Sequence, residues 1–542
     1  MPTPADLVFR NGPVHTLGPA RTPATAVAVR DGLIIAVGRD AEVRPLIGAA
    51  TEVVDLAGRA LLPGFQDAHV HPVLAGVTMI QCDLHDVRDA DEALAAVRAY
   101  AEANPEVKWI AGGGWSMEWF SGGTPSRHLL DAVVADRPVH LINQDGHGAW
   151  VNTKALEMCG IDADTPDPVD GRIEREADGT PQGTLHEGAS GLVGRHLPET
   201  TADAMLRALQ AGQRRMHSVG VTAWQDAMVG PEVQGAYLAA AESGLLTARV
   251  VGALWWDRER GEEQVPELLA RRGGAGRFRA TSVKIMQDGV AENFTAAMTS
   301  PYLDGCGCRT GNQGLSFLDP ERLRAHVTRL DAEGFQVHVH AVGDRAAREA
   351  LDAFEAARAA NGMNDHRHHI AHLQVVHPGD VPRFAALGIT ANIQPLWAAH
   401  EPQMDELTIP FLGRERAGWQ YPFGDLVRAG ASLAAGSDWP VSSPDPFWGI
   451  HVAVNRTVPG GSQAVFLPEQ RLDLTTALAA YTIGTARVNH LDTRTGTIEE
   501  GKLADLVVTD RDPCSIPAGE LAETSVLATY VEGRRVHTDP TF

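Results

Sequence analysis

Eight short apolar segments in the central part of the chain constrain the fold more than any other feature of its sequence. Several of them follow stretches whose apolar residues recur at helical spacing, such as residues 319–334 and 343–362. Alternating helices and strands are typical of an α/β fold with a parallel sheet, and eight strands are what a TIM-type (β/α)8 barrel needs. We therefore predict this barrel. Its strands would be residues 60–71, 221–226, 248–256, 281–288, 335–340, 368–373, 388–394 and 431–438.

Both ends of the chain have the pattern of short strands joined by tight turns. Residues 24–38 contain an Arg-Asp-Gly hairpin signal, and the far end has a matching Glu-Gly turn. We predict that residues 1–60 and 488–542 together build a small β-sandwich domain, while residues 61–487 form the barrel. An insertion at about 79–200 separates the first two barrel strands and would lie over the barrel mouth.

The bulk composition excludes several classes of partner. A formal net charge of −23 leaves no basic stripe to neutralise phosphates, so we expect no nucleic acid. No apolar run reaches the roughly 20 residues that cross a bilayer, and the N-terminus lacks a signal-peptide pattern, so we expect no membrane partner. The five cysteines indicate reduced thiols in a cytoplasmic protein. A homodimer is retained as a candidate assembly.

The first predicted strand ends in a His-x-His pair formed by His69 and His71. Side chains of a strand alternate between its two faces, so these imidazoles point the same way. Two neutral imidazoles on one face can hold a metal ion. Two ordinary histidines near a turn would look the same, so this pair leaves both interpretations open.

The ends of other predicted strands carry further metal-ligand side chains. Lys284 lies on the fourth strand, His340 ends the fifth, His372 ends the sixth and Asp438 ends the eighth. Barrel enzymes keep their chemistry at the carboxyl ends of the strands. Nitrogen and oxygen ligands of this kind suit zinc, with manganese, iron or nickel as alternatives. The coincidence at several strand ends favours a metal site.

At these residues the chain resembles a known family. The stretches PGFQDAHVHP, DGHGAWVNTKALEMCGI, VKIMQDG, HVHAVGDRA, GSDWPVSSPDPFWGI and GTIEEGKLADLVV are similar to those of the amidohydrolase superfamily. They resemble most closely its amidohydrolase-3 branch, which includes YtcJ-like proteins and N-substituted formamide deformylases. The resemblance covers nearly the whole chain and implies a metal-dependent hydrolase, with one or two divalent ions per chain, Zn²⁺ being preferred.

The resemblance also implies a role for each ligand. His69 and His71 would bind the more buried ion, and His340 and His372 would hold the second. Lys284 would be carboxylated by CO₂, and its carbamate would bridge the two ions. An unmodified ammonium has no lone pair to donate, so the carbamate is chemically consistent with a ligand role. An ordinary ammonium beside a single zinc ion is the alternative.

Asp438 would act as the proton shuttle. The resemblance implies that it contacts the first ion, accepts the proton of the attacking water and passes it to the leaving nitrogen. A metal-activated hydroxide is available near neutral pH because a bound cation lowers the pKa of water.

Candidate substrate contacts come from loops around the mouth. In the resembling branch the equivalent of His147 faces the site, so we expect His147 to contact substrate. Trp115 and Trp150 in the insertion and Gln394 and Trp397 after the seventh strand are further candidates, although the insertion tryptophans could instead pack their own segment. Aromatic residues around the mouth favour an apolar or aromatic substituent.

The sequence therefore predicts hydrolysis of a small-molecule amide-type bond, such as an N-substituted formamide or N-acyl compound. A hydrolytic deaminase or cyclic amide hydrolase would use the same nucleophile. A non-catalytic regulatory or binding protein on the same barrel is the alternative from another class, and the intact ligand set argues against it.

Overall fold

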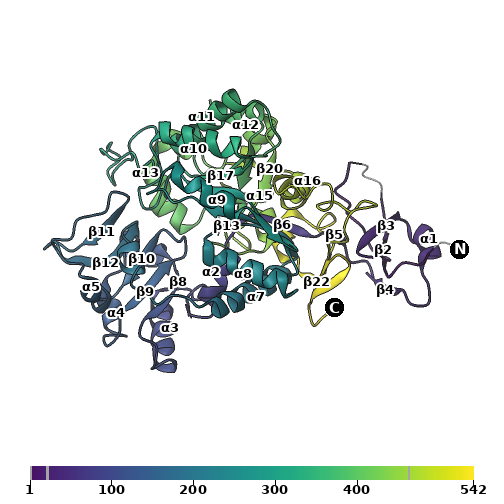
Figure 1. Ribbon diagram of the computed structural model, residues 1–542, viewed down its shortest axis with the longest axis horizontal. Coiled ribbons are helices and arrows are strands. Elements are labelled where there is room, and N and C mark those ends of the chain that lie inside the picture. Colours follow the sequence, from purple (N-terminus) through teal and green to yellow (C-terminus); the bar gives the residue numbers. More distant parts are fainter. Residues whose placement is uncertain (1–2, 20–22, 462–463) are drawn as a thin grey trace.

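A parallel sheet in chain order forms the centre of the molecule (Figure 1). The computed structural model describes residues 3–19, 23–461 and 464–542. Each strand pairs in parallel with the next. The eight strands along this path are β6 (Phe65–Val70), β13 (Val221–Val229), β14 (Arg249–Trp255), β16 (Phe278–Met286), β17 (Gln336–Ala341), β18 (His369–His372), β19 (Thr390–Ile393) and β20 (Leu433–Ala435).

Backbone hydrogen bonds beyond β20 bring the sheet back to its first strand. The Asp438 N–H donates to the His69 carbonyl at 2.8 Å, and the His71 N–H donates to the Trp439 carbonyl at 2.9 Å. Gly436 permits this approach, because a Cβ there would lie only 2.6 Å from the His69 nitrogen. The predicted (β/α)8 barrel is confirmed.

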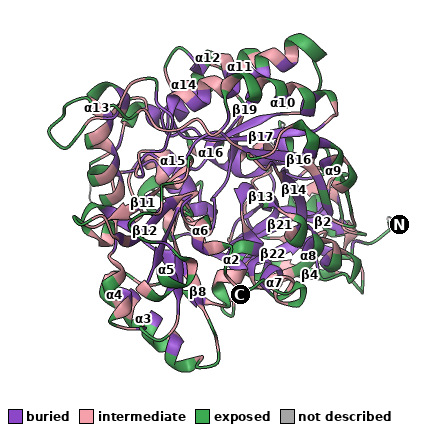
Figure 2. Ribbon diagram, turned by 60° about the vertical axis from the view of Figure 1, so that its left-hand side comes forward, coloured by how far each residue is buried: buried purple, intermediate pink, exposed green. Residues whose placement is uncertain are grey.

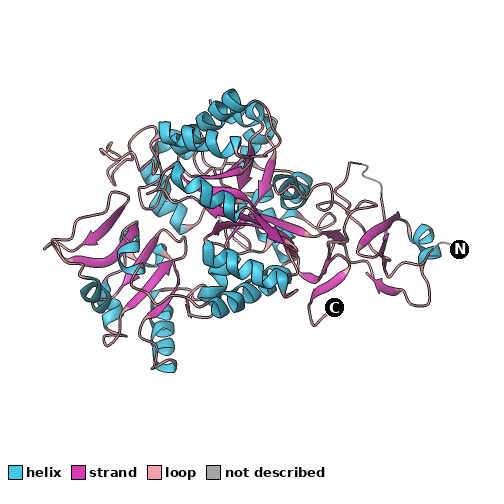
Figure 3. Cartoon of the chain, viewed as in Figure 1, coloured by secondary structure: helices cyan, strands magenta, loops and turns pink. Residues whose placement is uncertain are grey.

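Helices surround the barrel strands, as Figure 3 shows in cyan around magenta. Each buries a small or apolar stripe against the sheet, and the strands themselves are almost wholly buried (Figure 2). Asp319, for example, caps the helix that precedes β17 by accepting from the Glu321 and Arg322 N–H groups. The covering helices include α7 (Ala202–Ser218), α8 (Pro231–Glu242), α10 (Pro320–Ala332), α11 (Asp344–Asn361), α12 (Val381–Leu387) and α14 (Phe423–Arg428).

The first predicted strand, residues 60–71, is in fact two strands in different sheets. Its first part, β5 (Leu61–Pro63), pairs with β21 (Leu506–Thr509) in a small sheet, and only β6 belongs to the barrel. Gly64 joins them at a point where a Cβ would lie 2.5 Å from the Thr222 hydroxyl. An unbroken apolar run gives no sign of such a change of sheet, so the single-strand prediction was wrong.

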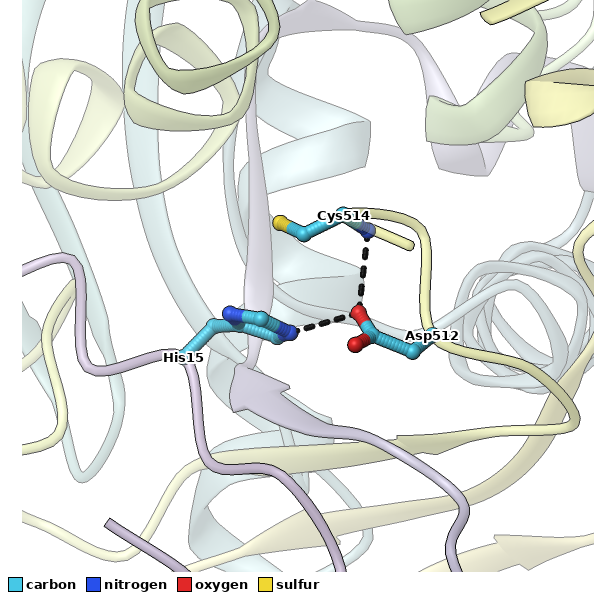
Figure 4. Close-up of side chains that lie close together, drawn as sticks. All are labelled: His15, Asp512 and Cys514. Atoms are coloured by element: carbon cyan, nitrogen blue, oxygen red, sulfur yellow. Dashed lines mark hydrogen bonds and ion pairs between the residues drawn. The ribbon is translucent and has the colours of Figure 1, made fainter. Parts of the chain in front are cut away.

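Two small sheets formed by the chain ends share one apolar core. Phe9 from the N-terminal sheet meets Tyr530 from the C-terminal one, edge to face, with ring centroids 5.0 Å apart. His15 also hydrogen-bonds Asp512, with 2.7 Å between Nε2 and Oδ1 (Figure 4). In the N-terminal sheet the strand order is β3 (Leu33–Gly38), β2 (Ala26–Arg30), β1 (Leu7–Arg10), β4 (Glu52–Asp55). In the C-terminal sheet it is β23 (Arg534–Thr538), β22 (Val526–Val531), β21, β5.

The insertion builds a separate six-stranded sheet at the opposite end of the molecule from the two terminal sheets (Figure 1). Its elements include α3 (Ala90–Ala103), α4 (Arg127–Asp131), α5 (Thr153–Cys159) and the strands β7 (Cys82–Asp83), β8 (Ile110–Trp115), β9 (Val139–Asn143), β10 (Gly148–Val151), β11 (Gly171–Arg175) and β12 (Pro181–Glu187). Among the residues that the structure describes, none of the helices has the length and apolar character needed to cross a membrane.

Candidate metal centre and substrate cavity

The carboxyl ends of the barrel strands bring the six predicted ligand residues together. Asp438 Oδ1 lies 3.3 Å from His69 Nε2 and 3.0 Å from His71 Nε2. The same His69 nitrogen lies 3.4 Å from the Lys284 amine. These four residues come from the first, fourth and last strands of the barrel, which meet here because the sheet closes.

The remaining two ligands complete the group from the fifth and sixth strands. His372 Nδ1 lies 3.8 Å from Asp438 Oδ2, and the rings of His340 and His372 have centroids 4.3 Å apart. His372 and Asp438 both adopt left-handed backbone conformations, with φ of 78° and 56°. Such conformations cost non-glycine residues free energy, and they are concentrated at functional sites.

The free donor atoms of this group fit a divalent cation. The ligand atoms of His69, His71 and Asp438 all lie within 4.8 Å of one another. His372 Nδ1 is buried without a hydrogen-bond partner among the described residues, and Asp438 Oδ1 likewise makes no well-formed hydrogen bond. Buried polar atoms without partners are costly, and imidazole and carboxylate donors in this number suit zinc-like ions.

Burial also prepares the imidazoles for a metal. It lowers the pKa of His69, His340 and His372 well below the ordinary histidine value, and nearby positive groups lower it further. Metal ligation requires the neutral imidazole with a free lone pair. The three rings are therefore held in the form that binds a cation.

Lys284 is buried beside these rings, and Asp438 and Asp226 act on its amine only from beyond ion-pair distance. Its side chain belongs to a residue that is 2% exposed, and none of the carboxylates that the structure describes lies within 4.0 Å of its amine. The pairing with Asp438 or Asp288 that an ordinary ammonium would need is thus absent from the described part of the chain. Burial lowers the pKa of the Lys284 amine to about 8.

Two glutamines below the centre fix the direction of a hydrogen-bond chain. Gln336 Nε2 donates to the backbone carbonyls of Arg367 and Val488 at 2.9 and 2.6 Å. Carbonyls only accept, so the Gln336 side-chain oxygen must face Gln225, whose Nε2 donates to it at 3.0 Å. The side-chain oxygen of Gln225 is therefore free to accept a hydrogen bond from the imidazole of His338.

This chain sets the tautomer of His69. The Gln225 oxygen lies 2.7 Å from His338 Nδ1, which must therefore carry the hydrogen. His338 Nε2 then accepts from His69 Nδ1 at 2.9 Å, and the lone pair of His69 Nε2 points to the centre. His338 is fully buried and orients a ligand.

Gln394 supports His372 and does not line the cavity. Its side-chain oxygen accepts from the His372 N–H at 2.8 Å, and its amide donates to Asn392 at 3.1 Å. Being 1% exposed, Gln394 lies too deep for the predicted substrate contact. Trp397 does line the cavity, and its ring stacks on His372 with centroids 5.5 Å apart.

A cavity of about 470 Å³ opens above the centre. His340, His372 and Asp438 line its floor, and His147 reaches it from the insertion. His147 Nδ1 lies 2.9 Å from Glu187. Although burial alone would lower it, the Glu187 carboxylate raises the pKa of His147 to about 9. His147 is therefore a cation at neutral pH and faces the space where substrate would lie.

The two insertion tryptophans predicted as substrate contacts lie elsewhere. Trp115 and Trp150 are at most 1% exposed and belong to the core of the insertion. Their indole N–H groups donate to the carbonyls of Leu141 and Ser126 at 2.8 and 3.0 Å. Satisfied indoles inside an apolar cluster pack the insertion, so the structure corrects this part of the prediction.

Sequence reasoning missed several functional side chains. Glu187, which holds His147, and Gln225, which begins the hydrogen-bond chain, were not singled out. Three carboxylates that line the cavity, Glu118, Glu292 and Glu401, were also missed. Gln225 lies on β13, one residue before Asp226. A polar residue within a barrel strand was the sequence signal that could have pointed to it.

Comparison with known proteins agrees with this architecture. The model of the amidohydrolase family (Amidohydro_3) matches residues 52–537. Protein LONG AFTER FAR-RED 3 of Arabidopsis thaliana is 34% identical over 98% of this chain and 92% of its own length. N-substituted formamide deformylase of Arthrobacter pascens is 29% identical over 97% of each chain.

A solved structure has the same fold. The chain of an uncharacterized metal-dependent hydrolase from Pyrococcus horikoshii OT3 superposes with a TM-score of 0.74 at 24% identity. It covers 95% of this chain and 99% of its own length.

A closed parallel barrel with ligand side chains at the carboxyl ends of its strands is the arrangement of a barrel enzyme. The family match extends over most of the chain, and the chain belongs to the amidohydrolase family. It is accordingly a hydrolase that acts on carbon–nitrogen bonds.

Proposed function

We propose that this chain hydrolyses a small-molecule amide, with N-substituted formamides and N-acyl amines as its substrates. A cluster of six ligand side chains, three of which line the floor of one cavity, carries this proposal. The relative from Arthrobacter pascens, named an N-substituted formamide deformylase, supports the choice of bond.

The residues at the floor would hold one or two divalent cations, with zinc preferred for its imidazole and carboxylate donors. Such a cation would lower the pKa of water and polarise an amide carbonyl. Every other step depends on side chains of the chain itself.

Asp438 would transfer the proton from the attacking water to the leaving group. Its Oδ1 faces the centre without a well-formed hydrogen bond, and the residue lines the cavity. A carboxylate so placed can accept a proton from the attacking water and deliver it to the nitrogen of the leaving amine. The amide C–N bond then breaks, and the acid and the amine are released.

His147 would orient the substrate from the part of the cavity wall that the insertion provides. As a cation held by Glu187, it can donate a hydrogen bond to the substrate carbonyl. His147→Ala should raise KM or lower kcat about tenfold or more, the scale of a hydrogen bond to a charged group, while metal content stays unchanged. Loss of bound metal in this variant would place His147 among the ligands instead.

Lys284 would react with CO₂ to form a carbamate. A new N–C bond joins the neutral amine to the carbon, and one proton leaves. The observation in support is a buried amine without a counter-ion among the described residues, 3.4 Å from His69 Nε2. A carbamate would add a negative charge beside neutral imidazoles, and electron density beyond the amine in a metal-loaded crystal would test it.

A substrate screen tests the function. The purified chain, loaded with zinc or manganese, should release amines from N-substituted formamides or N-acyl amino acids. Ammonia release from aminated heterocycles alone would indicate a deaminase, and opening of cyclic amides alone a cyclic amide hydrolase. Full metal content without turnover of any class would favour the regulatory alternative.

A further inference from the structure

One wall of the cavity is acidic. Four carboxylates line it, and the term acidic wall refers to these residues below: Glu118, Asp145, Glu292 and Glu401. They come from distant segments, since Glu118 and Asp145 belong to the insertion, Glu292 follows β16 and Glu401 follows β19. Three separate parts of the chain thus bring carboxyl groups to one space.

Lysine and arginine side chains of the described residues do not balance this wall, although the His147 imidazole acts on Asp145 and Glu292. Among the residues that the structure describes, the cavity lining contains no lysine or arginine, and none of the four carboxylates lies within 4.0 Å of one. Glu292 accepts a hydrogen bond from the Thr408 hydroxyl at 2.6 Å, and Asp145 accepts one from the His147 N–H at 2.8 Å. His147, the nearby cation, is already paired with Glu187.

The carboxylates also repel one another. Burial raises the pKa of Glu401 to about 8, and the neighbouring Glu118 and Glu292 raise it further toward that value. Burial likewise raises the pKa of Glu292 and of Glu118. Like charges gathered in a partly buried space are unfavourable, so Glu401 is largely protonated at neutral pH until a cation joins the wall and favours its ionised form.

The remaining cavity wall suits an organic cation. Three aromatic residues, Trp397, Tyr421 and Trp448, line the same space. Aromatic faces attract ammonium groups, as do carboxylates. At the floor, the unpartnered Nδ1 of His372, on a residue 2% exposed, belongs to the metal centre and marks where the amide would react. The cavity therefore joins a reacting centre to a cation-binding wall.

We propose that the substrate is an amide whose amine portion carries a second, positively charged nitrogen, as in a monoacylated diamine. This inference rests on the proposed function: the carbonyl would face the centre while the ammonium contacts Glu292 and Glu401. An apolar linker would lie against Leu396 and Met404, which also line the cavity. The acidic wall would then select among amides by charge.

A binding experiment tests the wall without any turnover. Butyltrimethylammonium, which has no lone pair to ligate a metal, would be titrated calorimetrically into the metal-loaded protein. We expect binding by the unaltered chain and a Kd at least about tenfold higher in the double variant Glu292→Gln and Glu401→Gln, the scale of one interaction with a charged group. Glu415→Gln, which removes an exposed carboxylate outside the cavity lining, is the matched control.

Equal Kd values in the unaltered chain and the double variant would overturn the inference, as would the absence of binding. Calcium that binds at the wall and blocks the organic cation would also overturn it, because the wall would then be an inorganic cation site. The proposed function would survive each of these results.

A kinetic comparison separates the two proposals. N-formyl-1,5-diaminopentane and N-formylhexylamine have the same length and differ in one terminal charge. We expect kcat/KM to favour the charged member about tenfold or more, and the ratio to fall in Glu401→Gln. Turnover of both without preference would overturn the charge selection alone. If neither compound is turned over, the proposed function is contradicted. The titration with butyltrimethylammonium would then still test whether the acidic wall binds an organic cation.

Discussion

The floor and the upper wall of one cavity are built in different ways. The floor consists of residues at the ends of β6, β16, β17, β18 and β20, and the closed sheet fixes where each one points. The wall comes from loops and from the insertion, including Glu118, His147 and Glu292. Strand geometry therefore determines the chemistry of the centre, whereas the docking of distant segments determines what the centre can receive.

The largest effect should come from Lys284, because the floor depends on it for charge. Lys284→Ala should lose bound metal and reduce activity to background, and short carboxylic acids should restore part of both by filling the gap. Metal analysis and turnover with and without added acetate would measure this. Lys108→Ala, at an exposed site, is the control. Full metal content and normal turnover in Lys284→Ala would show that the floor functions without this residue.

Asp438 should show the next largest effect. Asp438→Asn keeps the shape of the side chain but removes its proton-accepting charge, so kcat should fall about 10²-fold or more, as expected for loss of a general base. Stopped assays at several pH values, together with metal analysis, would separate lost proton transfer from lost metal. Near-normal turnover would contradict the assignment.

His338 tests whether support below the floor matters. His338→Phe keeps a ring of similar size but removes the acceptor that orients His69, so metal affinity should fall about 10- to 100-fold. Competition with a chelator would measure it. His326→Phe is the matched control, because His326 is buried without ring hydrogen bonds among the described residues and lies outside the centre. Equal losses in both variants would indicate a general packing effect.

The smallest effect on catalysis should come from Trp115 in the insertion core. Trp115→Phe removes the indole donor from the buried Leu141 carbonyl, which should lower the free energy of unfolding by about 1–3 kcal/mol. KM and kcat should change little. Thermal unfolding beside steady-state kinetics would test this, with Trp397→Leu as the contrasting cavity variant. A large change of KM in Trp115→Phe would indicate that Trp115 contacts the substrate after all.

The same contrast explains what the sequence could predict. Strand ends and their alternation indicated the barrel and the six residues of the floor, Lys284 among them, because backbone geometry alone directs those side chains. The support from Gln225 and Gln336 depends on side-chain orientations that emerge only when strands pack side by side. The insertion tryptophans could have faced either their own core or the cavity, and only the packed insertion decides between them.

Metal removal and return tests the central claim most directly. The purified chain would be stripped with a chelator, assayed on an N-substituted formamide, and assayed again after addition of zinc or manganese. We predict that turnover disappears with the metal and returns in proportion to the metal restored. Unchanged turnover by fully stripped protein would contradict the account, because the residues assembled at the strand ends would then act without the cation that their geometry fits.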